Sequence, residues 1–295
     1  MPNLKEVRTR ITSVKSTQQI TSAMKLVAAS KLRKAQTAIQ MLRPYAEKLL
    51  EILQNLSSSL ENLEEAVYVE ERPVEKAMLI VVTSNRGLCG PFNGNVIRRT
   101  KKYISEAYPE LNSKGNLDLF CIGKKGSDHF SKSNFNVARV NNEIFDELTF
   151  ENVTDIAEDL MRQFKSKEYD KIEIIYNKFV NAAVQELTIE QYLPLIPPEA
   201  EEKHGKEEIT DFIFEPGKEE IITELLPKTL RIQLYKSLID SFASEQGARM
   251  TAMHQATENA KEILRDLQLS YNKARQAAIT KELLEIVSGA EALKG

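Results

Sequence analysis

The chain has few of the residues that build metal centres and disulfide frameworks. Its 295 residues include two cysteines, Cys89 and Cys121, three histidines and no tryptophan. Two cysteines do not make a disulfide framework, and three scattered histidines without neighbouring cysteines argue against a zinc site. We therefore expect no metal site and a reducing compartment.

Long apolar runs are also missing. No run reaches the roughly 18 residues that a membrane-spanning helix needs. The mean hydropathy of -0.36 and the 28% of charged residues are typical of a soluble protein. The opening residues, MPNLKEVRTR, have no apolar signal core, so we expect neither a cleaved export segment nor direct membrane insertion.

Glycine is absent from the stretch 4–63 and occurs once, as Gly247, in the stretch 227–288. Both stretches therefore predict long helices. At ~1.5 Å per residue each would measure about 90 Å, whereas a compact chain of this length has a radius of gyration near ~19 Å. We expect the two ends to pack on each other as a shaft, which favours a mechanical or bridging role over an enzyme.

A seven-residue apolar repeat runs from Val7 to Leu63, which is the pattern of a coiled coil. Three polar residues interrupt it: Gln18, Thr21 and Lys25. Three apolar residues beside them predict that the stripe moves one position earlier: Ile20, Met24 and Val27. Pro44 predicts a bend near 40–42 that does not end the helix.

The closing stretch carries a similar repeat in two registers. One register consists of Ile239, Met253, Ala260, Leu267 and Ala274. The companion register consists of Phe242, Ala256, Ile263, Ala277 and Leu284. Alanines at these positions allow two helix axes to approach closely.

The middle of the chain alternates strand and helix patterns. Continuous apolar runs predict strands buried on both faces at Ala77–Thr83, Leu117–Ile122 and Lys171–Tyr176. Residues 187–193 predict an edge strand, and apolar faces predict helices that include 96–107 and 153–164. This order predicts a small, mainly parallel α/β sheet.

The loop 84–95, SNRGLCGPFNGN, lies between a predicted strand and a predicted helix, where phosphate-binding loops occur. It has neither GxGxxG nor the lysine of a GK[ST] motif, so a tight glycine-containing turn explains it better than a nucleotide site. Cys89 has no assignable base partner, and His254 with Glu258 fits a surface pair. We predict no catalytic site and no cofactor.

Charge is distributed unevenly. Residues 1–50 contain ten Lys and Arg against two acids, whereas 199–224 contain ten acids against three Lys. The basic residues spread around the first helix without interleaved aromatics, which favours an acidic protein partner over nucleic acid. Residues 197–220 predict a loop because they are rich in proline, glycine and charge.

Three segments of the chain are distinctive: ITSVKSTQQITSAMKLVAASKLRKAQ at 11–36, SNRGLCG at 84–90, and the closing helix at 244–292, which contains ARMTAMHQATENA and ARQAAITKE. These segments resemble the γ subunit of bacterial F-type ATP synthases. The segments follow the family's order from end to end, and the two terminal ones are long and specific.

The resemblance implies an antiparallel two-helix coiled-coil shaft, residues 1–70 and 221–295, with an inserted Rossmann-like α/β domain at 75–215. The chain would be the central-stalk rotor, with no active site, that transmits rotation of the membrane c-ring to the catalytic β subunits and regulates ATPase activity and proton flow. Its partners would be the α and β subunits, the ε subunit with δ as a further candidate, and the c-ring. It would lie peripherally at the cytoplasmic face of the bacterial inner membrane.

The resemblance also implies contact residues. The rotor–β contact would involve Met24 and Lys25 in the first helix and Arg249, Arg275, Gln276, Thr280 and Glu282 in the last. Phe214 and Glu215 match the foot that faces ε and the c-ring. Asn85 departs from the acidic residue expected before Arg86, and the chain lacks the paired-cysteine insert of the plant plastid relatives.

Two alternatives remain open on sequence. A coiled-coil adaptor with a nucleotide-binding head predicts saturable ATP binding. A nucleic-acid-binding protein predicts an affinity for duplex DNA that falls steeply with salt.

Overall fold

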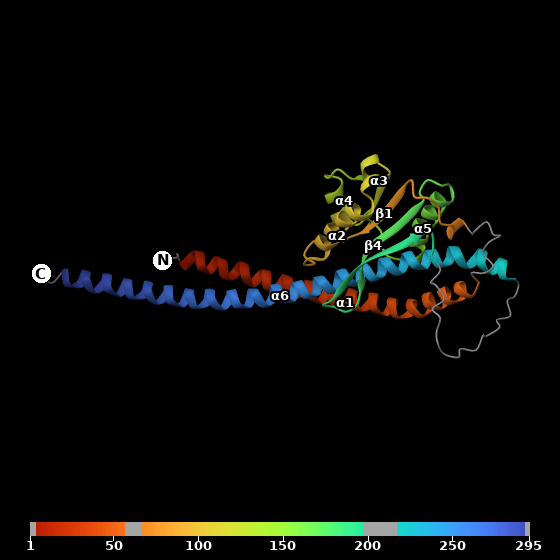
Figure 1. Cartoon of the computed structure of the whole chain (residues 1–295). Helices are drawn as coiled ribbons and strands as arrows, with labels where there is room; N and C mark the ends of the chain where they lie inside the picture. Colours follow the sequence, from red (N-terminus) through yellow and green to blue (C-terminus); the bar gives the residue numbers. More distant parts are fainter. Residues whose placement is uncertain (1–3, 57–66, 197–216, 293–295) are drawn as a thin grey trace, which may run out of the picture. The chain divides into compact units, whose positions relative to one another are not determined.

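The computed structural model describes residues 4–56, 67–196 and 217–292, which form two compact units (Figure 1). We call residues 4–28 and 249–292 the helix-pair unit, and the described residues from 29 to 248 the sheet unit. Two long helices contribute to both units: α1 (Leu4–Leu56) and α6 (Lys218–Ala292). The predicted fold class, paired terminal helices with an inserted α/β sheet, is confirmed.

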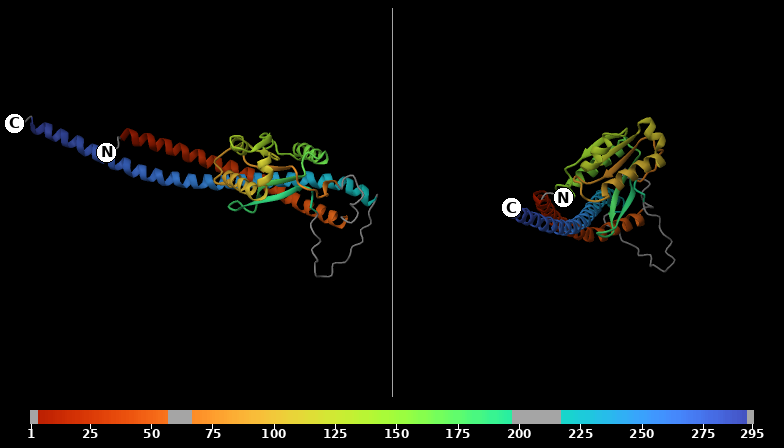
Figure 2. Two further views of the ribbon diagram at one scale, coloured as in Figure 1. Left: turned by 45° about the horizontal axis from the view of Figure 1, so that its top comes forward. Right: turned by 90° about the vertical axis from the view of Figure 1, so that its left-hand side faces the viewer.

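The sheet unit contains a five-stranded sheet in the order β3-β2-β1-β4-β5. The strands are β1 (Ala77–Val82), β2 (Leu117–Ile122), β3 (Asn136–Asn141), β4 (Lys171–Phe179) and β5 (Gln185–Leu193). The first four are parallel, and β5 runs antiparallel to β4 at the edge (Figure 2). This confirms the mainly parallel sheet and the predicted edge strand, whose antiparallel direction was not predicted.

Helices cover both faces of this sheet, which explains the continuous apolar runs. The shorter helices are α2 (Phe92–Ala107), α3 (Pro109–Lys114), α4 (Lys124–Phe130) and α5 (Phe150–Lys165). Successive side chains of β1 alternate between two cores. Met78 and Ile80 pack with residues of α5 and α6, whereas Leu79 and Val81 pack with residues of α2.

Helix α5 shows how its sequence determines its position. Thr149 caps the first turn, because its hydroxyl accepts a hydrogen bond from the backbone N–H of Asn152. The apolar face predicted from helical spacing is buried in full: Val153, Ile156, Ala157, Leu160, Met161 and Phe164. In α2 the agreement is poorer, because Ala107 is exposed and Phe92 and Thr100 are buried instead.

The last helix begins earlier than the sequence predicts. Helix α6 starts at Lys218, so 218–220 belong to it rather than to the predicted loop, and Pro227 lies inside it. The upstream turn forms because Ile222 and Leu226 are buried in the core under the sheet. Helix α1 likewise continues through Pro44 to Leu56, as predicted. The acidic loop 197–212 lies outside the described residues.

In the sheet unit, α1 and α6 pack against each other in opposite directions. Ala46 and Leu49 of α1 form a buried cluster with Ile232 of α6, and Arg43, earlier in α1, pairs with Asp240, later in α6. Most heptad residues of α1 predicted for this seam are buried, and Leu42 is half-buried. The buried ones are Leu32, Ala35, Ile39, Ala46, Leu49 and Leu53.

Candidate protein interface on the paired helix ends

The helix-pair unit has a narrow seam of small and polar side chains. The segments of α1 and α6 lie side by side in all three views, antiparallel to each other (Figures 1 and 2). Thr21 and Thr257 are buried at the seam, and their hydroxyl oxygens lie 2.8 Å apart. Each hydroxyl also contacts a carbonyl oxygen of its own helix, Gln18 or Met253. The two helices therefore stay paired through these polar threonines, which are buried like the apolar residues of the seam.

Two predictions about the seam are wrong. The stripe of α1 does not move one position earlier, since Ile20 is 59% and Val27 58% exposed while Thr21 is buried. In α6 the companion register runs through Thr257, with Leu264 and Tyr271 half-buried, whereas the predicted Ile263 and Leu284 are exposed. In α1 the buried Thr21 occupies a heptad position that was read as an interruption, and in α6 the buried Thr257 belongs to neither predicted register.

Large apolar side chains therefore point outward from this unit. On α1 these are Ile20, Leu26 and Val27. On α6 they are Ile263, Leu269, Ile279, Leu283, Leu284, Ile286 and Val287. All residues from 281 to 291 are exposed. Apolar side chains at this density on a surface indicate a protein interaction site. If the seven-residue repeat of α1 is continued through Thr21 without a shift, Leu26 and Val27 fall outside the seam. The sequence therefore contained a signal for their outward position.

A groove of about 520 Å³ lies between the two helices of this unit. It is lined by Gln18, Gln19, Ser22, Ala23, Lys25, Leu26, His254, Thr257, Glu258 and Lys261. Lys25 Nζ lies 3.3 Å from His254 Nδ1, and Lys261 Nζ donates to Glu258 at 2.7 Å. The Lys261 ammonium lowers the pKa of Glu258. His254 and Glu258 are both exposed, as expected of a surface pair, and each also contacts a lysine.

The predicted contact residues fall into three groups. Met24 and Lys25 are half-buried on α1, and Lys25 lines the groove. Arg249 is buried, with 9% exposure. The other four are exposed on α6: Arg275, Gln276, Thr280 and Glu282. Lys25 makes a cross-helix contact, with its Nζ 3.3 Å from His254 Nδ1. Phe214 and Glu215 lie outside the described residues, and the roles of all nine remain predictions.

The loop after β1 engages its own backbone and the neighbouring loop. Three consecutive backbone N–H groups of the neighbouring loop, those of residues 124–126, donate hydrogen bonds of 2.8–3.0 Å to this loop. Their acceptors are Asn85 Oδ1, the Ser84 carbonyl and Thr83 Oγ1, in that order. These amides stand at the edge of the sheet where phosphates bind in related folds. Their bonds to the chain itself favour the tight-turn interpretation, with Leu88 and Gly90 at positive φ of 63° and 58°.

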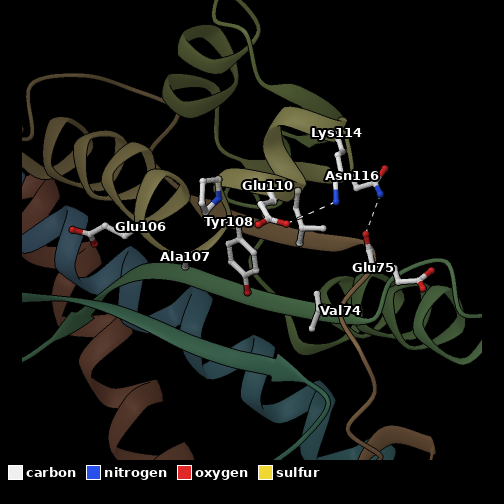
Figure 3. A pocket seen from close by; sticks show the side chains of 10 residues that line it. Val74, Glu75, Glu106, Ala107, Tyr108, Glu110, Lys114 and Asn116 are labelled. Atoms are coloured by element: carbon white, nitrogen blue, oxygen red, sulfur yellow. Dashed lines mark hydrogen bonds and ion pairs between the residues drawn. The ribbon is translucent and has the colours of Figure 1, made fainter.

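A second pocket, of about 770 Å³, lies at the opposite, amino-terminal edge of the sheet (Figure 3). Tyr108 reaches from it toward β4 and donates a 2.8 Å hydrogen bond to the buried carboxylate of Glu173. The carboxylates of Glu106 and Glu110 already face lysines, Lys102 at 3.5 Å and Lys114 at 3.8 Å. In open α/β sheets, ligands bind beyond the carboxyl ends of the strands. A pocket at the opposite edge therefore gives no indication of a ligand-binding or catalytic site.

None of the helices in the described ranges 4–56, 67–196 and 217–292 is long and apolar enough to cross a membrane.

A family model described as ATP synthase matches residues 3–293. The ATP synthase gamma chain of Flavobacterium johnsoniae is 57% identical over 295 residues, which covers all of both chains. This chain belongs to the ATP synthase γ-chain family. The gamma chain of Cytophaga hutchinsonii is 51% identical over 99% of both chains. As a member of this family, the chain is a subunit of an ATP synthase.

Two solved ATP synthase structures contain chains with a similar fold. A chain of the central stalk/c-ring structure of the Tetrahymena thermophila mitochondrial ATP synthase matches with a TM-score of 0.56 at 25% identity, over 80% of this chain and 99% of that chain. A chain of the Euglena gracilis mitochondrial ATP synthase rotor matches with a TM-score of 0.62 at 20% identity, over 94% and 98%.

Proposed function

We propose that this chain is the central-stalk rotor subunit of the F1 sector of a proton-translocating ATP synthase. The full-length match to γ chains supports this role, together with a helix pair whose large apolar side chains face outward. The α and β subunits surround the pair, and ε, with δ as a further candidate, and the c-ring bind its foot. The chain has no active site or cofactor of its own and lies at the cytoplasmic face of the bacterial inner membrane.

The mechanism requires surfaces that differ around the rotor. A rotating chain biases the conformations of the β subunits only if it contacts their alternative states differently. The helix-pair unit offers two kinds of surface, the outward apolar residues and the polar groove around Lys25 and His254. Rotation driven by the c-ring presents these surfaces to each β subunit in turn and regulates ATPase activity and proton flow.

The proposal includes the predicted contacts and domains. Met24, Lys25 and Arg249 contact the β subunits, as do the exposed Arg275, Gln276, Thr280 and Glu282 of α6. Phe214 and Glu215 form part of the foot. The shaft comprises 1–70 and 221–295, and the Rossmann-like side domain comprises 75–215.

Co-expression with the α and β subunits of the same ATP synthase tests the rotor function directly. We expect a complex with one copy of this chain per ring, and an ATPase rate that drops when residues 270–295 are deleted. A chain that stays apart from α and β on sizing would overturn the proposal. Saturable ATP binding by the isolated chain would favour the adaptor alternative.

A matched pair of substitutions tests the contact at Met24. Met24→Lys adds a charge to the proposed β contact, so we expect it to reduce the coupling of proton flow to ATP synthesis more than assembly. Met41→Lys makes the same change at a residue of α1 that is 74% exposed in the sheet unit, and should leave coupling intact. Equal loss of coupling and assembly at Met24 would rule out that assignment.

A further inference from the structure

Asp240 of α6 is a fully buried carboxylate in the sheet unit. Its side chain has 0% exposure, and neither carboxylate oxygen has a hydrogen-bond donor among the described residues. The guanidinium of Arg43 on α1 lies 3.6 Å away, an ion-pair distance longer than a hydrogen bond. Buried polar groups are nearly always hydrogen-bonded, so this carboxylate requires an explanation.

The charged groups around Asp240 compensate it only in part. Arg43 is itself 43% exposed, and its Nη2 donates to the carbonyl of Phe179, at the end of β4, at 3.2 Å. Two further cations act on Asp240, Lys236 of α6 and Lys178 of β4. Tyr176 of β4 also faces it, but donates its hydroxyl hydrogen to Glu190 of β5 at 2.7 Å.

Strand β4 also meets this face of α6. Ser244, one helical turn after Asp240, donates its hydroxyl hydrogen to the backbone carbonyl of Asn177 at 3.0 Å. The Asn177 side chain itself belongs to the other face of the sheet, since its cross-strand partner Leu187 packs in the core on the α2 side. At the contact of α1, α6 and β4, the Asp240 carboxylate is therefore a group that water would solvate better than the packed protein does.

The α1 backbone is weakest at this level. Arg43 precedes Pro44, which has no N–H and so leaves the carbonyl of Gln40 without its helical partner. On the other side of Pro44, the Lys228 ammonium of α6 lies 5.7 Å from the centre of the Tyr45 ring. Pro44 is thus the residue of α1 without a backbone N–H, and the residues on both sides of it, Arg43 and Tyr45, have side chains that contact α6.

We propose that Asp240 is a proton-sensitive switch: protonated, it keeps the Arg43–Tyr45 segment of α1 packed on α6 and β4, and ionised, it loosens that packing. The neutral acid tolerates burial without donors far better than the carboxylate does. Opening of the contact admits water to the Asp240 carboxylate and to the Arg43 guanidinium together. The inference concerns the sheet unit alone and does not depend on the rotor function.

The sign of the pH dependence follows from burial. Burial raises the pKa of Asp240 in the packed state, although Arg43, Lys236 and Lys178 oppose the shift. The stabilisation of the packed state is therefore fully present below the usual aspartate pKa near ~4 and is lost as pH rises through the packed-state pKa.

Amide hydrogen exchange of the full chain between about pH 4 and 8, corrected for the intrinsic rate, tests the switch. We expect protection of residues 40–46 to fall by up to about tenfold per pH unit and then to level off. Asp240→Asn should remove this dependence. Lys228→Gln, which changes the exposed contact to Tyr45, should alter protection by one constant factor at every pH.

Equal pH dependence in the wild type and Asp240→Asn would overturn the proposal, as would pH-independent protection in the wild type. The carbon-13 resonance of the Asp240 carboxyl gives a test that needs no variant. A midpoint above the usual range supports the switch, and a midpoint near ~4 refutes it even if Asp240→Asn fails to fold.

Discussion

The helix-pair unit and the sheet unit bury different kinds of side chain. Most buried positions in the first are small or polar, such as Ala28, Thr257 and Ala260, while Leu26 and Leu284 are more than 60% exposed. In the sheet unit, large apolar side chains such as those of Phe120 and Phe164 are fully buried. The sheet unit thus has a large apolar core of its own, whereas many large apolar side chains of the helix-pair unit face outward.

The largest expected effect comes from the tyrosines of the sheet unit, because burial raises the pKa of several of their hydroxyl groups. The pKa of Tyr103 is raised to about 12, and those of four others are also raised: Tyr108, Tyr169, Tyr176 and Tyr192. The stability contributed by these neutral phenols is complete below their usual pKa near ~10 and is lost as pH rises through about 12.

We therefore expect the sheet unit to unfold cooperatively as pH rises from about 10 to 12. Tyrosinate absorbance and near-ultraviolet circular dichroism should change together in this range. Ionisation of all tyrosines near pH ~10, with the circular dichroism unchanged, would contradict the burial of these hydroxyls.

The buried carboxylate of Glu173 provides the next largest test. It accepts hydrogen bonds from Tyr103 and Tyr108 at 2.8–3.0 Å and pairs with Lys171 at 3.1 Å. Glu173→Ala leaves these donors without an acceptor, so we expect the free energy of unfolding in urea to fall by about 3–5 kcal/mol. Glu106→Ala, which removes an exposed carboxylate from α2, should cost less than about 1 kcal/mol. Similar losses would show that the Glu173 cluster is not a buried network.

The strands covered on both faces and the edge strand β5 could be predicted from sequence, whereas the other edge strand, β3, could not. β1, β2 and β4 show as apolar runs because α2, α5 and α6 exclude water from both faces. β3, with the sequence NVARVN, was missed because its residues alternate between exposed and half-buried and none is fully buried. The start of α6 was misplaced because Pro227 resembles a first-turn proline, and the upstream turn depends on burial against the sheet.

The candidate interface could be predicted only in outline. Heptad spacing indicated that the helix ends pair, but Thr21 looked like an interruption because its partner Thr257 is 236 residues away in sequence. A local pattern cannot show that a buried hydroxyl is satisfied by a distant one. For this reason the apolar stripe was expected to shift to Ile20 and Val27, which are both exposed.

Thr21→Val tests the polar seam with an effect of intermediate size. The substitution keeps the shape but removes the hydroxyl that lies 2.8 Å from Thr257 Oγ1. We expect a loss of about 1 kcal/mol in the free energy of unfolding, typical of one buried hydrogen bond. Thr12→Val removes a similar hydroxyl from an exposed site on α1 and should change stability by less than about 0.5 kcal/mol. A more stable Thr21→Val chain would mean that the seam is held by apolar packing alone.

The smallest expected effect on stability comes from substituting an exposed isoleucine of the helix-pair unit, and the matched control is a buried isoleucine of the sheet unit. Ile263 is 50% exposed on α6, whereas Ile174 of β4 has 0% exposure. Ile263→Ser should change the free energy of unfolding by less than about 0.5 kcal/mol, because the side chain packs little within its own chain. Ile174→Ser should cost several kcal/mol, since it removes buried apolar surface and introduces a buried hydroxyl. If the outward residues serve a partner, Ile263→Ser should nevertheless weaken binding to the α and β subunits in the same co-expression and sizing assay. An Ile263→Ser chain that is stable and also binds normally would remove Ile263 from the interface.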